Sequence, residues 1–307
     1  MSAEPPWPGV SVVVPTHARP ELMARAVRSA LAQRYAGPLE VLVVFDACEP
    51  VLPEVDVVDG RSLRAVVNGR TRGLAGARNS GILASSHPWV AFLDDDDHWA
   101  PEKLALQLAL VADHPDAVLV GSAIEVDDGR RRHRRSVPAV VTHGDLILNR
   151  LAGLHSSSFV VRRSALLGPL GLVDEGLPRS YAEDYDLLLR AAELAPIRVV
   201  DQPLVTVSWQ GRSHFLGWWG SYADALELLL RKHPGFAASR RGRGRLEAQI
   251  AFARAAQGQR RDALRWTARA LRTDPRRLRA WLAAGISAGV VHPDHVAAVG
   301  RRFGRGL

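Results

Sequence analysis

Four consecutive carboxylates are the residues of this chain best suited to chemistry. They are Asp94, Asp95, Asp96 and Asp97, and they follow the apolar run 89–93. Like charges this close repel, so a fold holds them at low cost only where positive charge lies among them. An apolar run that stops at carboxylates is typical of a buried strand, and open α/β sheets bind ligands at the carboxyl ends of their strands. A divalent cation holding a diphosphate would supply the counter-charge, because hard cations prefer oxygen ligands. The simpler interpretation is a solvated acidic turn that caps the next helix.

Two further polar residues stand where a ligand could reach them. Asp46 follows the apolar run 39–45, so its carboxylate could accept the imide hydrogen of a uracil or thymine ring. Aspartate is also a common turn or helix cap, which is the alternative. Arg78 lies in a glycine-flanked segment and offers a permanent cation to a diphosphate or a base. An ion pair between Arg78 and the aspartates is the other interpretation, and the two are compatible.

The elements that must position these residues alternate between strands and helices. Continuous apolar runs predict strands, whereas apolar residues at helical spacing and a proline at a first helical position predict helices. The predicted strands are 10–14, 39–45, 62–67, 89–93, 118–124, 156–161 and 197–207, the last an edge strand around Pro203. The predicted helices between them are 20–33, 74–85, 101–112 and 181–194. This alternation predicts an α/β fold with a parallel, doubly wound sheet. The basic run 130–135 is expected in an exposed hairpin or loop.

The character of the chain changes after Trp209. Helical patterns cover 215–232, 245–257, 261–272 and 275–284, and the arginine and glycine run 240–244 is expected to be the joint between them. The stretch 251–275 resembles one tetratricopeptide-like helical pair, which cannot bury its own apolar face and should lean on neighbours. We therefore expect two domains, 1–210 and 211–307, the second a helical extension.

Composition restricts the class of protein. With 307 residues and 47% hydrophobic content the chain can build one large core or two smaller ones. The single cysteine, Cys48, excludes a disulfide framework and a cysteine-rich metal site, and fits a reducing cytoplasm. Residues 1–9 lack the pattern of a signal peptide, and no apolar stretch approaches the roughly 20 residues that span a bilayer. We expect a cytoplasmic protein that is soluble or peripheral to a membrane.

The net charge of +8 is unevenly distributed. Residues 231–307 carry 18 Arg and Lys against four Asp and Glu, so the remainder of the chain is acidic. A basic C-terminal region favours an anionic membrane surface or an acidic partner. Nucleic acid is the weaker choice, because no recognised nucleic-acid-binding motif accompanies the charge.

Five motifs, in order along the first 210 residues, resemble family 2 glycosyltransferases. They are the opening strand and helix with Pro15, Thr16, Arg19, Ser29 and Gln33; Phe45-Asp46 together with the segment 73–81; the aspartate run after Phe92-Leu93; Ser157-Ser158 with 160–163; and Glu183-Asp184 with Arg190. The resemblance implies the nucleotide-sugar-binding fold called GT-A. Phe45 stands where the family usually has a first aspartate, which affects the contact with the base.

The resemblance also implies roles for individual residues. The substrate-binding set would be Pro15, Thr16, Asp46, Arg78, Asp94, Asp95 and Glu183, with Asp94 near the ribose of the donor. Asp96 would bind Mn²⁺ or Mg²⁺, and His214 would add a ligand from the segment after the sheet. Because four aspartates stand in a row, the register is open by one position, and Asp95 and Asp97 are alternatives.

Asp184 is the predicted general base. An acceptor hydroxyl must lose its proton as it attacks the anomeric carbon, and a carboxylate opposite the leaving diphosphate would take it with inversion. Neighbouring residues on a helix point in different directions, so only one of Glu183 and Asp184 should face the sugar. The alternative is that both are ordinary first-turn helix acids, which the helix dipole favours.

The predicted function is therefore transfer of a sugar from a UDP-, dTDP- or GDP-sugar to a sugar or lipid-linked acceptor, in cell-envelope polysaccharide or glycoconjugate synthesis. One alternative is a non-catalytic nucleotide-sugar-binding or scaffold protein on the same fold. Another is a phosphatase or phosphotransferase with an aspartyl nucleophile. His98 stands where those enzymes have threonine, which disfavours this last class.

Overall fold

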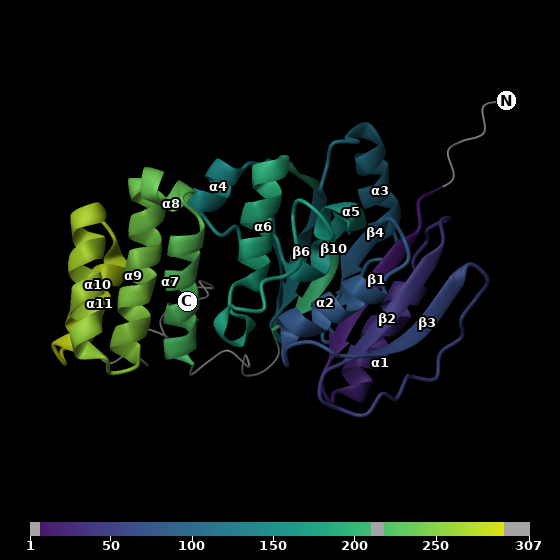
Figure 1. Cartoon of the computed structure of the whole chain (residues 1–307), viewed down its shortest axis with the longest axis horizontal. Coiled ribbons are helices and arrows are strands. Elements are labelled where there is room, and N and C mark those ends of the chain that lie inside the picture. Colours follow the sequence, from purple (N-terminus) through teal and green to yellow (C-terminus); the bar gives the residue numbers. More distant parts are fainter. Residues whose placement is uncertain (1–6, 210–217, 292–307) are drawn as a thin grey trace. The chain divides into compact units, whose positions relative to one another are not determined.

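A computed structural model describes residues 7–209 and 218–291 of the chain. The chain divides into two compact units, and each is described here by itself (Figure 1). The first unit comprises Met1–Leu146, Arg150–Gly176 and Glu183–Ser213. The second comprises Ile147–Asn149, Leu177–Ala182 and His214–Leu307.

Four parallel strands form one half of the sheet in the first unit. Their order is β3-β2-β1-β4, with β1 at Val10–Thr16, β2 at Leu39–Phe45, β3 at Arg61–Val67 and β4 at Trp89–Phe92. Every residue of β1, β2 and β4 is buried, as expected for apolar strands that are covered on both faces. Helix α1, Pro20–Leu31, links β1 to β2, and helix α2, Leu74–Ala84, links β3 to β4. The parallel arrangement places the ends of β1, β2 and β4 on one edge, where the aspartate run begins.

The other half of the sheet mixes strand directions. Strand β9, Val160–Arg162, is antiparallel to both β4 and β6, Leu119–Asp127, whereas β10, Ile197–Ser208, is parallel to β6. Strand β7, Arg132–Arg135, lies antiparallel to β6, so the basic run forms the exposed hairpin that was one of the two expectations. The predicted α/β fold with a mainly parallel sheet is confirmed.

Two predictions about the later strands are wrong. Residues 156–158 form a short 3-10 turn and not the start of a strand, because strand β9 begins only at Val160. Strand β10 is not an edge strand. It pairs with β6 on one side and with β5, His98–Trp99, on the other, and Pro203 sits at a register irregularity. Proline is tolerated there because a bulge releases the chain from one ladder hydrogen bond.

The remaining elements of the chain up to β10 are short connectors and two longer helices. They are α3 at Lys103–Asp113, β8 at Val140–Val141, α4 at His143–Leu148, α5 at Arg163–Leu166, a 3-10 turn at Pro178–Ser180 and α6 at Glu183–Leu194. Helices α3 and α6 correspond to predicted helices, and each begins two residues later than predicted.

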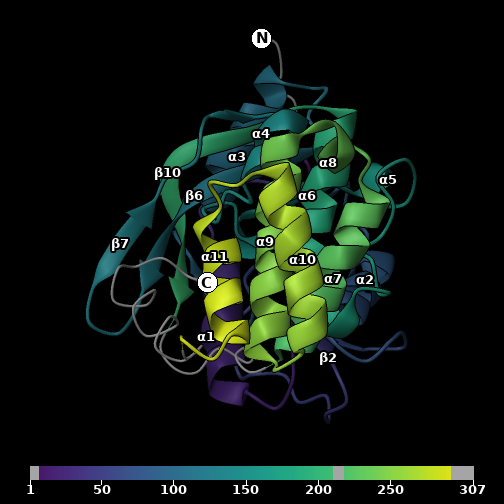
Figure 2. The same cartoon turned by 90° about the vertical axis from the view of Figure 1, so that its left-hand side faces the viewer.

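The second unit is helical. It contains α7 at Trp219–Lys232, α8 at Gly235–Ala238, α9 at Arg240–Ala256, α10 at Arg260–Thr273 and α11 at Leu278–Ser287. Figure 2 shows α7, α9 and α10 side by side, and their contacts agree. One small core joins buried alanines to Phe252 and Ile286. No helix within the described ranges is long and apolar enough to cross a membrane.

The glycines expected at a joint serve close packing instead. Helix α9 already begins at Arg240, with Ser239 accepting a hydrogen bond from the backbone N–H of Gly242 at 3.1 Å. A Cβ on Gly242 would lie 2.6 Å from the carbonyl oxygen of Ile147, and one on Gly244 would lie 2.8 Å from Cβ of Asp274. The prediction of a joint at 240–244 is therefore wrong, because these glycines let other segments pack against the first turns of α9.

Candidate active site

The aspartate run alternates between buried and partly exposed side chains. Asp95 and Asp97 are 1% exposed, whereas Asp94 and Asp96 are partly exposed. Strand β4 ends at Phe92, and the backbone N–H of Asp97 bonds to the carbonyl of Asp94 at 3.1 Å, which closes a turn. Asp95 and Asp97 therefore fix the run to the protein interior, and Asp94 and Asp96 remain accessible at the sheet edge.

The last residue of strand β1 and a residue just after the strand hold Asp95. The hydroxyl of Thr16 donates to its carboxylate at 2.7 Å, and Nε of Arg19 donates at 3.1 Å. Burial raises the pKa of Asp95 to about 6, although the Arg19 guanidinium opposes this. Arg19 also pairs with Asp96 at 3.1 Å. Pro15 is buried one residue earlier on β1, beside Val44 of β2. The structure therefore brings Thr16 to the aspartate run.

Arg78 is the buried cation among these carboxylates. Its side chain is 2% exposed and forms ion pairs with Asp94 at 2.6 Å and with Glu183. The same guanidinium donates to the hydroxyl of Ser156 at 2.9 Å. Burial alone would lower the pKa of Arg78, but Asp94 and Glu183 reverse that and raise it. Burial likewise opposes ionisation of Asp94, yet Arg78 and then His155 hold its pKa below the usual value. The ion pair expected as one interpretation of Arg78 is present.

Asp46 organises the turn before helix α2. Its carboxylate accepts from the Asn68 side-chain amide at 2.7 Å and from the backbone N–H of Gly73 at 2.9 Å. Gly73 has φ 119°, and a Cβ on Gly76 would lie 1.8 Å from the Thr71 carbonyl oxygen, so both positions require glycine. The turn-capping interpretation of Asp46 is thus present in the structure. Its side chain remains partly exposed.

A second carboxylate fastens this turn from the other side. Glu175 accepts from the Asn79 side-chain amide at 2.6 Å and from the backbone N–H of Thr71 at 3.2 Å, and it pairs with Arg70. Burial would raise its pKa, but these three partners hold it at about 2. Asn79 also bonds the backbone of Val173 in both directions. Asn79 therefore shapes the backbone of this turn.

Glu183 and Asp184 open helix α6 and have different partners. Glu183 is 6% exposed and pairs with Arg78, and burial raises its pKa to about 7. The side chain of Asp184 is 21% exposed and pairs with Arg150, whose own side chain is 26% exposed. Asp184 is therefore the more accessible of the two carboxylates.

The backbone just before α6 is held in an unusual conformation. Arg179, Ser180 and Ala182 have φ values of 55°, 56° and 61°, in the left-handed region that non-glycine residues rarely occupy. Each such residue stores on the order of 1 kcal/mol or more, and strain of this kind clusters at functional sites. The position of Asp184 therefore depends on a segment whose conformation the surrounding structure must enforce.

One group of side chains fits a metal ion. Ligand atoms of Asp94, Asp97 and His155 all lie within 4.8 Å of one another. Burial raises the pKa of Asp97 to about 7, and His155 opposes this. A cation would favour the charged form of such a carboxylate, and carboxylate oxygens are the ligands Mn²⁺ and Mg²⁺ prefer. The donor set of two carboxylates and one imidazole therefore fits an ion of this kind.

Of the predicted metal ligands, Asp96 is not in this group, whereas Asp97, the alternative in the register, is. Asp96 pairs with Arg19, and its side chain is 36% exposed at the sheet edge. His214 lies outside the described residues.

Sequence reasoning missed His155 and Arg150. Both lie far along the chain from the carboxylates they meet, so no local pattern places them. One signal was present for His155: it precedes three serines, an unusual start for a buried strand. In the structure its side chain caps the 3-10 turn by accepting from the backbone N–H of Ser157 at 3.3 Å.

The mainly parallel sheet with an acidic edge and a buried arginine has the arrangement that the family 2 motifs predict. The family model described as "Glycosyl transferase family 2" matches residues 11–167. The chain belongs to this family, and the enzyme class predicted from its motifs is confirmed.

Curated relatives match parts of the chain. A UDP-Glc:alpha-D-GlcNAc-diphosphoundecaprenol beta-1,3-glucosyltransferase, WfgD of Escherichia coli, is 25% identical over 180 residues, which cover 59% of this chain and 68% of the relative. The succinoglycan biosynthesis protein ExoO of Rhizobium meliloti strain 1021 is 35% identical over 122 residues, which cover 39% of this chain and 33% of the relative. The chain thus spans about two thirds of the first relative and one third of the second.

Solved structures share the fold over nearly the whole chain. Residues 1–349 of S. aureus TarS, solved with UDP-GlcNAc, superpose with a TM-score of 0.63 at 16% identity and cover 96% of this chain and 92% of that one. The mannosyltransferase PcManGT from Pyrobaculum calidifontis, solved with GDP-Man and Mn²⁺, gives 0.55 at 20% identity, with 97% and 88% covered. At this identity the likeness shows the GT-A fold alone, which confirms the predicted fold.

Proposed function

We propose that this protein transfers a sugar from a nucleoside-diphosphate sugar to an acceptor hydroxyl with inversion at the anomeric carbon. The observation that carries the proposal is the convergence of the aspartate run, Arg78 and the first turn of α6 at one sheet edge. Arg78 contacts carboxylates from both other elements. A UDP-, dTDP- or GDP-sugar is the proposed donor class.

In this proposal Asp184 accepts the proton of the acceptor hydroxyl. The acceptor oxygen forms a bond to the anomeric carbon as the bond from that carbon to the diphosphate oxygen breaks. The electron pair leaves with the nucleoside diphosphate. Arg150 keeps the Asp184 carboxylate in one orientation through their ion pair. Its accessibility relative to buried Glu183 supports Asp184 as the base.

The remaining site residues bind the donor in the same proposal. Asp46 accepts from the base, Asp94 contacts the ribose, and Arg78 orients Asp94 and Glu183 through its two ion pairs. Pro15, Thr16 and Asp95 complete the donor side through the β1 end, where Thr16 and Asp95 are hydrogen-bonded.

We further propose that Mn²⁺ or Mg²⁺ binds at this edge. Asp96 with Asp94 is the set implied by the family motif, and the group of Asp94, Asp97 and His155 supports a cation there. When bound, the ion would offset charge on the departing diphosphate. His214 is kept as a proposed additional ligand.

The acceptor is proposed to be lipid-linked and to belong to cell-envelope polysaccharide synthesis. WfgD supports this, because its name describes glucose transfer to a diphosphoundecaprenol-linked sugar. The protein would then work at the cytoplasmic face of the membrane. A soluble sugar acceptor would make such a location unnecessary.

Substitution of Asp184 by Asn tests the reaction. We expect kcat to fall by roughly 10²–10⁴ because the general base is lost, with donor affinity nearly unchanged. Nucleoside diphosphate release is measured with UDP-, dTDP- and GDP-sugars in Mn²⁺, in Mg²⁺ and with a chelator. Thermal shift reports donor binding separately, since a bound donor stabilises the fold. Glu193→Gln is the matched control, because Glu193 lies on the same helix and is 46% exposed.

Each outcome of this experiment decides something. Full activity of Asp184→Asn would remove the proposed base. Donor binding without turnover on any acceptor would favour a nucleotide-sugar-binding protein. Activity that is unchanged by the chelator would contradict the proposed metal.

A further inference from the structure

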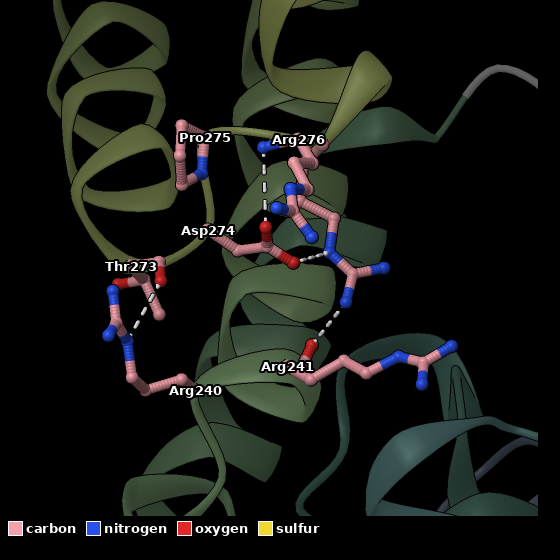
Figure 3. Close-up of a pocket in the computed structure, with 7 residues that line it drawn as sticks. Arg240, Arg241, Thr273, Asp274, Pro275 and Arg276 are labelled. Atoms are coloured by element: carbon pink, nitrogen blue, oxygen red, sulfur yellow. Dashed lines mark hydrogen bonds and ion pairs between the residues drawn. The ribbon is translucent and has the colours of Figure 1, made fainter.

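An arginine-rich cleft opens at one end of the second unit. It lies between the start of α9 and the turn from α10 to α11 (Figure 3). The residues that line it are Arg240, Arg241, Thr273, Asp274, Pro275, Arg276 and Arg277. Four of these seven residues are arginines and one is acidic, so the cleft carries a net positive charge.

Most of this positive charge has no internal counter-charge. Arg277 pairs with Asp274 at 2.7 Å and also donates to the carbonyl of Arg241 at 2.6 Å. Within the part of the chain that the structure describes, Arg240 donates only to the carbonyl of Thr273, at 3.3 Å. Among residues 7–209 and 218–291, no carboxylate forms an ion pair with Arg240, Arg241 or Arg276, and all three are exposed. Three guanidinium groups are therefore available to an external anion.

The arginines also lie at the N-terminal ends of two helices, where a positive charge is unfavourable. Arg240 and Arg241 are the first residues of α9, and Arg276 and Arg277 directly precede α11. Neither helix has an acidic residue in its first turn. The N-terminal end of a helix carries partial positive charge, so cations there are unfavourable and an anion is favourable. A phosphate group in the cleft would offset both sources of positive charge, and guanidinium groups bind phosphate with paired hydrogen bonds.

Two exposed apolar side chains lie next to the cleft. Leu278 is 70% exposed and Trp281 is 56% exposed. They are three residues apart on α11, so they share a helix face. The indole N–H of Trp281 donates to the carbonyl of Pro275 at 3.0 Å, which holds the ring beside the cleft. Arginines flanking an exposed tryptophan and leucine are typical of a surface that enters the headgroup region of a bilayer.

We propose that this end of the second unit docks on a membrane, with Arg240, Arg241 and Arg276 binding phosphate headgroups of anionic lipids. Leu278 and Trp281 then enter the boundary between headgroups and acyl chains. Free phosphate would satisfy the arginines but would leave the apolar pair in water, which is why the lipid is the assigned ligand. The inference rests on the lipid-linked acceptor of the proposed function and names the surface that would bring the enzyme to it.

The first test removes the cleft charge in the full chain. Arg240→Gln, Arg241→Gln and Arg276→Gln are combined, because glutamine keeps the helix and most of the side-chain length. Binding is measured by co-sedimentation with phosphatidylcholine vesicles that contain or lack phosphatidylglycerol. The wild type should bind only the anionic vesicles, less so at high salt, and the variant should bind about 100-fold more weakly.

A charge-matched control separates the cleft from general basicity. Arg260→Gln, Arg261→Gln and Arg265→Gln remove the same charge from exposed positions in the first half of α10, whose last residue lines the cleft. We expect this control to bind within about 3-fold of the wild type, because charges beyond a Debye length from the membrane are screened.

The second test addresses the apolar pair. Leu278→Ala with Trp281→Ala should weaken vesicle binding about 10-fold, because less apolar surface leaves water. Leu264→Ala is the control, since Leu264 is 52% exposed on α10.

Three results would overturn the inference. The first is that the wild type does not bind anionic vesicles, and the second is that the cleft and control variants lose binding equally. The third is that the cleft variant loses binding of inorganic pyrophosphate, read by thermal shift, but keeps its binding to vesicles. Nucleoside diphosphate release from a soluble donor is measured on the same variants without vesicles. Because these residues are not among the proposed base and donor residues, this release should be unchanged. A failure of vesicle docking is thereby distinguished from a failure of the proposed reaction.

Discussion

Two charged regions of this protein handle their charge in opposite ways. At the sheet edge, Arg78 is buried and pairs with Asp94 and Glu183. At the end of the second unit, Arg241 and Arg276 are exposed and have no ion pair among the described residues. The first region has two carboxylates, one after β4 and one on α6, around one cation, and the second has four arginines around one carboxylate.

The difference follows from solvation. A buried charge loses its hydration, so it must be neutralised inside the protein, and its partners become fixed in position. An exposed charge keeps its hydration and gains little from an internal partner. The buried set therefore fixes the geometry of the candidate active site, whereas the exposed set retains its capacity to bind something outside the chain.

The largest effect is expected when the buried pair is broken. Arg78→Met leaves Asp94 and Glu183 without their cation and should destabilise the protein by about 3–5 kcal/mol. The free energy of unfolding is measured with urea. Arg34→Met is the comparison, because Arg34 is 76% exposed and pairs at 3.0 Å with Glu102, which is itself 47% exposed. It should cost at most about 1 kcal/mol, and equal losses for the two variants would contradict the contrast between buried and exposed pairs.

A smaller, pH-dependent effect is expected for Glu175. Hydrogen bonds and Arg70 hold its pKa at about 2 in the folded protein, against 4.5 for the free side chain. A carboxyl with a lowered folded pKa contributes stability above its unfolded pKa and loses it as the pH falls through its folded pKa. Glu175→Gln should therefore destabilise by about 2 kcal/mol at pH 7, and the difference from the wild type should shrink between pH 4.5 and 2. Urea unfolding at pH 7, 5 and 3 measures it, and a difference constant across this range would show that charge is not the cause.

The smallest effect, with the opposite sign, is expected for the exposed region. Arg241→Gln removes a cation from the start of α9 and should stabilise the second unit by about 0.3 kcal/mol or leave it unchanged. Thermal unfolding checks this against Arg272→Gln, which removes an exposed arginine from the last turn of α10, where a cation is favourable, and should not stabilise the unit. A loss above about 1 kcal/mol would mean that Arg241 has an internal structural role.

The local elements of the fold were largely predictable, and the reason is visible in particular residues. Strand β2, Leu39–Phe45, matches its predicted range, and helix α1 begins at Pro20 as predicted. Both signals are local: a continuous apolar run in the first case, and the fixed φ of proline in the second. The prediction of a joint at 240–244 is wrong because its glycines are needed for close packing against Ile147 and Asp274. These neighbours are distant in sequence, so a local pattern does not reveal them.

The sequence by itself determined the family, the α/β architecture and the set of polar residues at strand ends. Motif order and apolar periodicity can be identified from the sequence without knowledge of the tertiary structure. Only the tertiary structure decided which charges meet: Arg19 with Asp95, His155 with Asp97, and Arg150 with Asp184. These partners are separated by 34 to 76 residues, and the order of strands in the sheet brings them together. Asp95 and Asp97 are buried, whereas Asp94 and Asp96 stay partly exposed to solvent. The neighbours in space decide this, because they determine which carboxylate loses its hydration.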